Sequence, residues 1–442
     1  MTSVIDIAAP ASKSVSHRAF ICAALARGRS LVRRALDSDD LVRTRQVLTT
    51  CGAGFTETDQ GWAIDGLGGK PRGGVLSPAD CNMGESGTSC RLLTAVLAAG
   101  QGLFRVHGEG RMHVRPIGKL TGALEPLGPR FEWEGQPGFP PFVIRTEGFS
   151  GGSVSVNLEE SSQYLSGILL GAPLAAGPVS VGIEGDKVVS WPYVSLTLMA
   201  MADFGAPVGV EILEHGVWKP HDPATVRDVS PGAVRFLARP GSYAARDYTV
   251  EADWSNASYF LAAGALGPAA VRVLGLRRDS LQGDRAILEI LESMGAAIAW
   301  DADGGVTVSP SALRGVELDM GHCPDLVPTV CAVAARATGR TVIRNVAHLR
   351  IKESDRLEAC ASQLRILGAT VDTFDDGLAV TPAPIAPGTR ASLSSFDDHR
   401  MAMSLSLFEL AGVTVELDNP RCVAKSFPGF WDQWAKLREA AR

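Results

Sequence analysis

Six stretches of the chain share one pattern of apolar and polar positions. Each begins with a helical run rich in Ala and Leu, reaches a Gly that ends the helix, and passes into a β-rich run. The stretches are residues 16–32, 90–106, 164–181, 258–273, 327–343 and 401–417. Their terminating glycines are Gly28, Gly100, Gly177, Gly267, Gly339 and Gly412, with spacings of 72, 77, 90, 72 and 73 residues. This spacing predicts six copies of one structural unit.

A second glycine marker recurs in step with the first, where an apolar residue and Gly end a helix before another strand. The second-marker glycines are Gly52, Gly128, Gly205, Gly295 and Gly368. Each copy, about 75 residues long, should therefore hold two helices and several strands. The long spacing of 90 divides the copies into two sets of three, and residues 239–253, rich in turn residues and charges, suit a crossover between the sets.

Polar and charged residues precede the first helix of every copy. A helix N-terminus offers free N–H groups and about half a positive charge, which suits phosphate and carboxylate ligands. Any single start is explained by ordinary Ser or Asp capping, but six starts of one kind indicate a shared anion site. The residues at these starts are Lys13, Ser14, Arg18, Gly84 to Arg91, Ser161, Ser162, Gln163, Asp253, Ser255, Asp325, Asp398, His399 and Arg400.

Composition limits the possible partners. The chain has 442 residues and a net charge of −6, which argues against nucleic-acid and membrane-surface partners. Its eight cysteines contain no CxxC pair and its histidines show no ligand spacing, so we expect reduced thiols and no metal. We find no signal-peptide pattern or membrane-length apolar window, and expect a cytoplasmic protein.

The stretch "LRIKESDRLEA", residues 349–359, carries five charged residues within the seven positions 350–356, directly before an apolar helical pattern. These charges are Arg350, Lys352, Glu353, Asp355 and Arg356. A solvated helix face is the ordinary explanation of such a run. The polar and charged residues at the other helix starts favour a functional explanation of this charge run instead.

Five motifs in order, "KSVSHR", "SSQYLSG", "IKESDR", "DDHRMAM" and "CVAKSFPGFW", resemble those of the 5-enolpyruvylshikimate-3-phosphate synthase family and span nearly the whole chain. The resemblance implies an α/β fold of two domains, each built from three βαβαββ units, with the active site in the cleft between them. It also implies that the chain crosses twice, so that residues 11–251 form one domain and residues 1–10 plus 252–442 the other. This is the enolpyruvyl transferase form of an inverted α/β barrel.

The family reaction transfers the enolpyruvyl group of phosphoenolpyruvate to shikimate 3-phosphate in the shikimate pathway of aromatic amino acid biosynthesis. By resemblance, the shikimate 3-phosphate ligands would be Lys13, Ser14, Arg18, Ser161, Ser162, Gln163, Ser190, Tyr193, Asp325 and Lys352. The phosphoenolpyruvate ligands would be Lys13, Gly87, Arg115, Gln163, Arg356, Arg400 and Lys425. Glyphosate would bind in the same pocket, against Gly87.

Charge counting supports the resemblance. A phosphate monoester carries about −1.5 to −2 at pH 7, so two substrates that each have a phosphate and a carboxylate bring roughly −5 to −6. The seven predicted cations are Lys13, Arg18, Arg115, Lys352, Arg356, Arg400 and Lys425, and they nearly match that charge. Arginines suit bidentate recognition of these anions, whereas lysines act as point charges and proton donors.

The implied chemistry needs an acid and a base. The catalytic candidates are Lys13, Asp325 and Glu353: Asp325 would take the hydroxyl proton, and the other two would serve C3 of phosphoenolpyruvate and the departing phosphate. Which residue protonates C3 stays open. We expect no cofactor, since phosphoenolpyruvate carries its own leaving group, and we expect a monomer.

Some positions depart from the commonest family pattern. Glu85 stands where an amide is usual, and its carboxylate would need a cation such as Arg91 beside it. His348 replaces a common Asn. Trp191 replaces a common Lys and should pack in the core. His399 is equally compatible with a structural and a catalytic role. Two alternatives remain: the sister UDP-N-acetylglucosamine enolpyruvyl transferase, which lacks the "SSQY" and "KESDR" pairing, and a non-catalytic anion-binding homologue.

Overall fold

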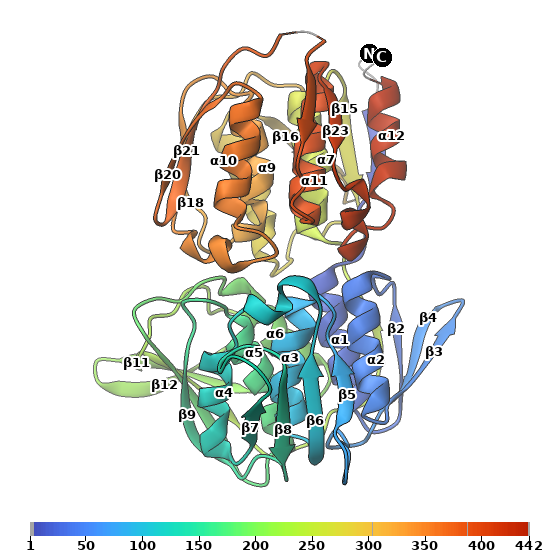
Figure 1. The fold of residues 1–442 in the computed structure, drawn as a ribbon, viewed down its shortest axis with the longest axis vertical. Helices are drawn as coiled ribbons and strands as arrows, with labels where there is room; N and C mark the ends of the chain where they lie inside the picture. The colour runs from blue at the N-terminus through green and yellow to red at the C-terminus, as the bar shows by residue number, and fades with distance from the viewer. Residues whose placement is uncertain (1–3, 303, 387, 441–442) are drawn as a thin grey trace. The chain divides into compact units, whose positions relative to one another are not determined.

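The computed structural model describes residues 4–302, 304–386 and 388–440. They form two compact units (Figure 1). Unit 2 is the continuous segment Ser12–Val250, and unit 1 combines the described residues up to Ala11 with those from Glu251 onward. The chain therefore passes between the units twice.

Unit 2 contains three sheets. The first, in spatial order, is β14 (Asp247–Thr249), β2 (Arg29–Arg33), β4 (Gly61–Asp65) and β3 (Gly54–Thr58). The second is β5 (Ala79–Asn82), β6 (Gly102–His107), β8 (Phe142–Thr146) and β7 (Arg130–Trp133). The third is β12 (Val217–His221), β11 (Gly209–Glu214), β13 (Val234–Ala238), β10 (Val179–Glu184) and β9 (Gly152–Asn157).

Unit 1 also contains three sheets among its described residues. The first is β1 (Val4–Ala8), β15 (Ala270–Leu274), β17 (Val306–Ser309) and β16 (Ala297–Trp300). The second is β18 (Glu317–Asp319), β19 (Thr341–Arg344), β21 (Gly377–Thr381) and β20 (Thr370–Phe374). The last has just two strands, β22 (Arg390–Leu393) and β23 (Thr414–Leu417).

Helices connect the strands. The α-helices of unit 2 are α1 (Lys13–Leu25), α2 (Asp39–Thr50), α3 (Gly87–Ala98), α4 (Gly118–Leu124), α5 (Gln163–Gly171) and α6 (Pro192–Asp203). Those of unit 1 are α7 (Trp254–Leu266), α8 (Ile287–Ser293), α9 (Val327–Ala334), α10 (Arg356–Ile366), α11 (His399–Leu405) and α12 (Phe430–Ala440). Short 3₁₀ segments that matter below are η1 (Gly110–Val114), η4 (Gly283–Ala286), η5 (Pro324–Leu326), η6 (Ala347–Ile351) and η8 (Pro420–Lys425).

The four-stranded sheets all have one strand order, in which the first two strands are parallel and a hairpin adds the last strand of the unit beside the second. In two of these sheets, a helix joins the first two strands, as in β5-α3-β6-α4-β7-β8. This is the predicted βαβαββ unit, and the α/β fold class is confirmed. The third sheet of unit 2 adds the extra strand β12, whereas in unit 1 the β22-β23 sheet has no such hairpin among the described residues.

Two strands come from distant parts of the sequence. The sheet that starts unit 2 takes β14 as its first strand, parallel to β2. The sheet that starts unit 1 takes β1, parallel to β15. The strand before each crossing of the chain therefore becomes the outer parallel strand of a sheet in the unit that the chain is leaving.

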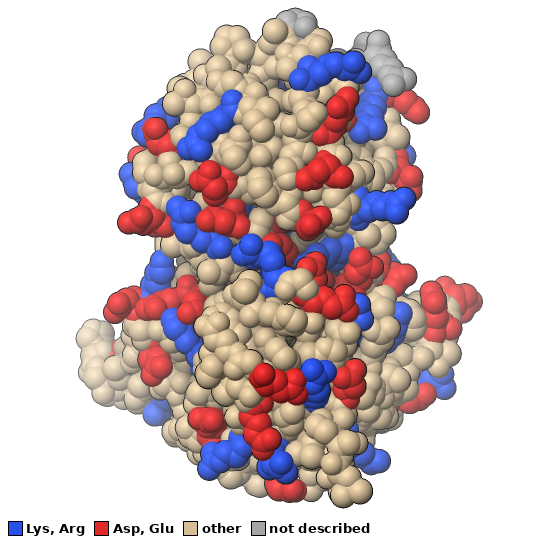
Figure 2. All heavy atoms as spheres, viewed as in Figure 1, with Lys and Arg blue, Asp and Glu red and all other residues tan. Residues whose placement is uncertain are grey.

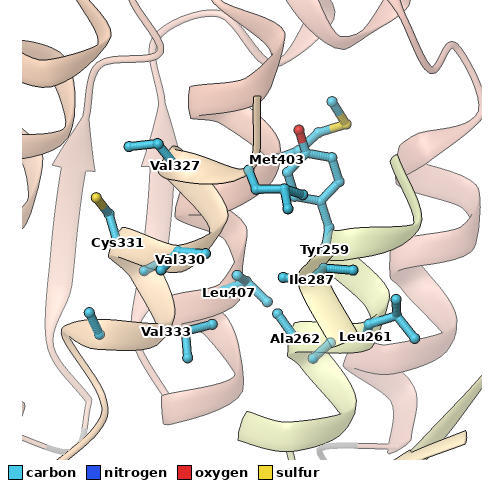
Figure 3. Close-up of a cluster of buried hydrophobic side chains, with 14 of the residues drawn as sticks. Tyr259, Leu261, Ala262, Ile287, Val327, Val330, Cys331, Val333, Met403 and Leu407 are labelled. Atoms are coloured by element: carbon cyan, nitrogen blue, oxygen red, sulfur yellow. The ribbon is translucent and has the colours of Figure 1, made fainter. Parts of the chain in front are cut away.

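The first helix of each copy forms the core. Every residue of α1 from Val15 to Leu25 is buried, as expected for a helix that is apolar nearly all round. In unit 2, α3 packs against both α1 and α5, and in unit 1, α9 packs against both α7 and α11. Figure 3 shows side chains of α7 and α9 directed toward one another, with Met403 and Leu407 between them.

The two glycine markers differ in conformation. All five second-marker glycines have positive φ, from 77° at Gly205 to 122° at Gly128, which is the left-handed geometry that ends many helices. Of the first-marker glycines, Gly28, Gly339 and Gly412 share it, while Gly267 has a φ of −84°. The periodicity is thus confirmed, although Gly267 ends its helix in extended backbone.

Candidate active site

In unit 2, the start of α1 holds Lys13 in an ion pair. Ser12 caps the helix by accepting a hydrogen bond from the Val15 amide, which fixes the helix start. Lys13 Nζ lies 3.1 Å from a carboxylate oxygen of Asp40 on α2, and both side chains are largely buried. Asp40 belongs to the acidic start of α2, but the sequence did not identify it as the partner of Lys13.

Arg18 lies one turn further along α1 and is 1% exposed. Its Nε donates to Thr197 at 2.7 Å, and its two Nη atoms donate to the carbonyls of Ser14 and Tyr193, each at 2.8 Å. Burial lowers the pKa of Arg18 to about 10, so the guanidinium stays charged at pH 7. Arg18 therefore holds two predicted substrate ligands in place, and its own contact with substrate stays a prediction.

The start of α3 brings Gly87 against Arg115. Ser86 caps the helix by accepting from the Ser89 amide. A Cβ on Gly87 would overlap Nη2 of Arg115, so the absence of a side chain lets the guanidinium approach the helix start. The Arg115 Nη1 also donates to the Glu85 carbonyl at 3.3 Å.

Gln163 joins this group from the start of α5. Its Nε2 donates to the hydroxyl of Thr88 at 3.0 Å, and its Oε1 accepts from Arg91 at 3.3 Å. Arg91 also lies over the Tyr164 ring, 5.8 Å from its centroid. Arg91, proposed above as a partner of Glu85, thus orients the amide of Gln163.

The remaining predicted ligands of unit 2 lie at the starts of α5 and α6. Ser161 accepts from the Gln163 amide at 3.2 Å, and Ser162 is the N-cap residue of α5. Ser190 is a non-glycine residue with a φ of 55°, an uncommon conformation that is typical of constrained loops. Trp191 is 1% exposed and donates to the Val226 carbonyl, so its predicted packing role is confirmed.

In unit 1, Arg356 is the centre of an ion-pair cluster. The side chain is 2% exposed, and each nitrogen meets a different carboxylate: Nε lies 2.8 Å from Asp398, Nη1 2.9 Å from Asp325, and Nη2 2.9 Å from Glu353. Burial by itself lowers the pKa of Arg356, but the three carboxylates outweigh it and raise the pKa. The guanidinium is therefore permanently charged.

Two further predicted cations adjoin the same carboxylates. Arg400 donates to Asp325 at 2.7 Å, and Lys425 of η8 lies 3.9 Å from Glu353. Asp398 is fully buried and also caps α11 by accepting from the Arg400 amide. The cluster thus places Asp325 and Glu353, the predicted proton-transfer groups, beside three cations.

The charged stretch 349–359 divides between two tasks. Asp355 caps α10 by accepting from the Glu358 amide, and Arg350 donates to Asp355 at 3.2 Å. These two residues fit the ordinary structural explanation. Glu353 and Arg356, by contrast, enter the buried cluster, so only part of the run supplies the candidate site.

The local charge is smaller than the sequence count suggested. Lys13, Arg356, Arg400 and Lys425 all contact carboxylates, namely Asp40, Asp325, Glu353 and Asp398. Within unit 1, the cations Arg356, Arg400 and Lys425 adjoin the three carboxylates Asp325, Glu353 and Asp398, so the positive charge of this cluster is largely balanced by the protein itself.

A further buried carboxylate, that of Asp284, interacts electrostatically with Asp325 and Arg400. Asp284, in η4, accepts a hydrogen bond from Ser255 at the start of α7. Burial, together with the charge of Asp325, raises the pKa of Asp284 to about 7, against the opposing effect of Arg400. Sequence reasoning missed Asp284, since a single acidic residue near a helix start carries no distinctive pattern.

Charges are mixed on the face of the molecule shown in Figure 2, where acidic and basic side chains alternate on both units. No helix within the described ranges combines the length and apolar content that a bilayer crossing requires. Among the same residues, no group of three His, Cys, Asp or Glu side chains could hold a metal ion.

A family model described as EPSP synthase (3-phosphoshikimate 1-carboxyvinyltransferase) matches residues 4–434. The chain belongs to the EPSP synthase family. A 3-phosphoshikimate 1-carboxyvinyltransferase of Shewanella baltica is 39% identical over 438 residues, covering 98% of this chain and 96% of that protein. A relative with the same name from Shewanella loihica is 39% identical and covers 97% of this chain.

Solved structures agree with the family assignment. An EPSP synthase from Acinetobacter baumannii matches with a TM-score of 0.75 and 26% identity, covering 99% of this chain and 96% of that one. An enolpyruvyl transferase from Streptomyces tendae matches with a TM-score of 0.74 at 17% identity, which shows the shared fold. EPSP synthase family members are enzymes of the shikimate pathway.

Proposed function

We propose that this protein transfers the enolpyruvyl group of phosphoenolpyruvate to the 5-hydroxyl of shikimate 3-phosphate and releases phosphate. The observation that carries the proposal is the unit 1 cluster, in which Asp325 and Glu353 lie beside Arg356, Arg400 and Lys425. Carboxylates can move protons, and the neighbouring cations can hold anionic substrates. The family assignment supplies the identity of the substrates.

In this proposal the reaction has two steps. The 5-hydroxyl oxygen attacks C2 of phosphoenolpyruvate while C3 gains a proton, which gives a tetrahedral intermediate. The bond from C2 to the phosphate oxygen then breaks and C3 loses a proton, which restores the double bond. Asp325 takes the hydroxyl proton, and Lys13 and Glu353 share the proton transfers at C3 and at the leaving phosphate.

The predicted binding residues fall into sets that fit this division of roles. Ser14 and Tyr193, held by Arg18, would bind shikimate 3-phosphate together with Ser161, Ser162, Ser190 and Lys352. Arg115 at the start of α3 would bind phosphoenolpyruvate near Gly87, with Gln163 adjacent. The family's phosphoenolpyruvate pocket would be completed by Arg356, Arg400 and Lys425.

One assay separates this proposal from the alternatives. Phosphate release from phosphoenolpyruvate is measured with shikimate 3-phosphate or UDP-N-acetylglucosamine as the acceptor. We expect release with shikimate 3-phosphate alone. Release only with the sugar nucleotide would favour the sister transferase, and binding of both anions without release would favour a non-catalytic homologue.

We further propose that the protein acts as a cytoplasmic monomer without a cofactor. The mixed charge on the face shown in Figure 2 and the absence of a membrane-length helix in the described ranges are compatible with that state. Light scattering after gel filtration should give a mass near that of one chain. A mass of two chains or more would contradict the monomer.

A further inference from the structure

A chain of buried hydroxyl groups runs between the first three helices of unit 2. The Oγ1 atom of Thr44, on α2, lies 2.8 Å from Nδ1 of His17 on α1 and 2.8 Å from Oγ of Ser89 on α3. Ser89 Oγ in turn lies 2.7 Å from Oγ of Ser86 and 3.2 Å from the Asp40 carbonyl. Thr44, His17 and Ser89 are all fully buried.

One direction of donation runs through the network from His17 toward Ser86. When Ser89 gives its one hydroxyl proton to the Asp40 carbonyl or to Ser86, it accepts from Thr44, and Thr44 accepts from the Nδ1–H of His17. Burial lowers the pKa of His17 to about 3, which agrees with a neutral ring at pH 7.

The network connects two parts of the proposed site. At one end, α1 carries Lys13, which pairs with Asp40 on the helix that bears Thr44. At the other end, Ser86 and Ser89 form the start of α3, where Gly87 lies against Arg115. The hydroxyl of Thr44 bonds to both α1 and α3.

We propose that Thr44 is a positioning residue that fixes the start of α3 relative to the Lys13–Asp40 pair, and thereby sets the phosphoenolpyruvate pocket of unit 2. The inference rests on the proposed function. A hydroxyl in this place acts through geometry, because a buried donor and acceptor are satisfied in only one arrangement of the three helices. Small displacements of a positioned group can lower rates substantially.

The test compares variants at Thr44 with a matched buried threonine. Thr44→Val keeps the shape and removes both hydrogen bonds, while Thr44→Ser keeps the hydroxyl. Thr146→Val is the control, because Thr146 is also buried and its hydroxyl donates to the Ala98 carbonyl at the C-terminal end of α3, away from the helix start at Gly87. Michaelis constants for both substrates, turnover and melting temperature are measured on each preparation.

We expect Thr44→Val to raise the Michaelis constant for phosphoenolpyruvate about tenfold and that for shikimate 3-phosphate less than threefold, the scale of losing one to two buried hydrogen bonds. Thr44→Ser should restore the wild-type values, and Thr146→Val should lose stability but keep its kinetic constants. Should Thr44→Val not fold, Ser89→Ala interrupts the same network and should show the same selective change.

Three results would overturn the inference: kinetic constants of Thr44→Val within twofold of wild type, equal changes for both substrates, or the same defect in Thr146→Val. A wild-type protein that releases no phosphate with either acceptor would instead overturn the proposed function, and the inference with it. The wild-type assay therefore distinguishes the two failures.

Discussion

The two units hold their candidate residues by different interactions. In unit 2, Arg18 and Thr44 bond to uncharged carbonyl, hydroxyl and imidazole groups, and Lys13 pairs with the single carboxylate of Asp40. In unit 1, Arg356 alone contacts three carboxylates. Neutral hydrogen bonds depend little on pH, whereas a buried ion cluster depends on every member being charged. The unit 1 half should therefore be more sensitive to pH and to loss of one charge.

The largest expected effect is on the buried arginines. Arg356→Met leaves three carboxylates with one cation fewer, and breaking a buried pair in this way costs about 3–5 kcal/mol of unfolding free energy. Arg18→Met, the matched change in unit 2, leaves neutral acceptors unpaired, at about 1–3 kcal/mol. Urea unfolding at pH 7 measures both. A larger loss for Arg18→Met would contradict the comparison.

Lys13→Met should lower turnover by about 10² or more, the usual scale for a positioned acid–base group. Its stability loss should be smaller than that of Arg356→Met because a single carboxylate, Asp40, is affected. Lys219→Met serves as the control, since Lys219 is half-exposed and pairs with Glu214 in the β11-β12 hairpin. Turnover near the wild-type value in a folded Lys13→Met protein would remove Lys13 from the catalytic residues.

Two buried groups should give opposite pH dependences of stability. The His17 pKa is lowered to about 3 in the folded state, so its contribution is fully present above pH 6.5 and is lost as the pH falls toward 3. The Asp284 pKa is raised to about 7, so its contribution is fully present below pH 3.8 and is lost as the pH rises toward 7. The charged neighbours of Asp284 include Asp325, Arg400 and Asp253.

Urea unfolding between pH 4 and pH 8 tests both groups. Relative to wild type, His17→Asn should gain stability as the pH falls through this range, and Asp284→Asn should gain as it rises. Each change should amount to about 1–3 kcal/mol, since one pKa unit corresponds to about 1.4 kcal/mol. If the unfolding free energies of wild type and a variant changed in parallel with pH, the replaced group would have the same pKa in the folded and unfolded states, which would contradict the prediction.

The smallest expected effect is at Gly87. The methyl of Gly87→Ala would meet the end of the Arg115 side chain, which can move aside at a cost of about 1 kcal/mol or somewhat more. Arg115 would then shift in the phosphoenolpyruvate pocket, and inhibition by the longer ligand glyphosate should weaken more than the affinity for phosphoenolpyruvate.

Gly122→Ala is the control for Gly87→Ala, because a Cβ at Gly122 meets nothing within 4 Å. The inhibition constant, Michaelis constant and melting temperature are compared on one preparation. An unchanged inhibition constant in Gly87→Ala would exclude Gly87 from the pocket.

Sequence reasoning was strongest where a residue's role is local. The second-marker glycines have the predicted helix-ending conformation because that geometry depends on a few neighbouring residues. The pairing of Lys13 with Asp40 and the burial of Asp284 depend on which helices meet, and neither leaves a pattern along the chain. The two-stranded form of the β22-β23 sheet, as far as the structure describes it, was also not foreseen, because the glycine spacing marks helix ends and carries no information on later strands.

The exchange of β1 and β14 has a consequence for synthesis on the ribosome. Unit 2 can complete its first sheet once β14 has been made, and it is one continuous segment. The strand β1 emerges first but pairs with β15, so about 270 residues must be synthesised before its partner exists. At about 5–20 residues per second this leaves the N-terminal strand without its parallel neighbour for about 10–50 s. Of the described strands, β1 is thus made before all the others but belongs to the unit that is completed last.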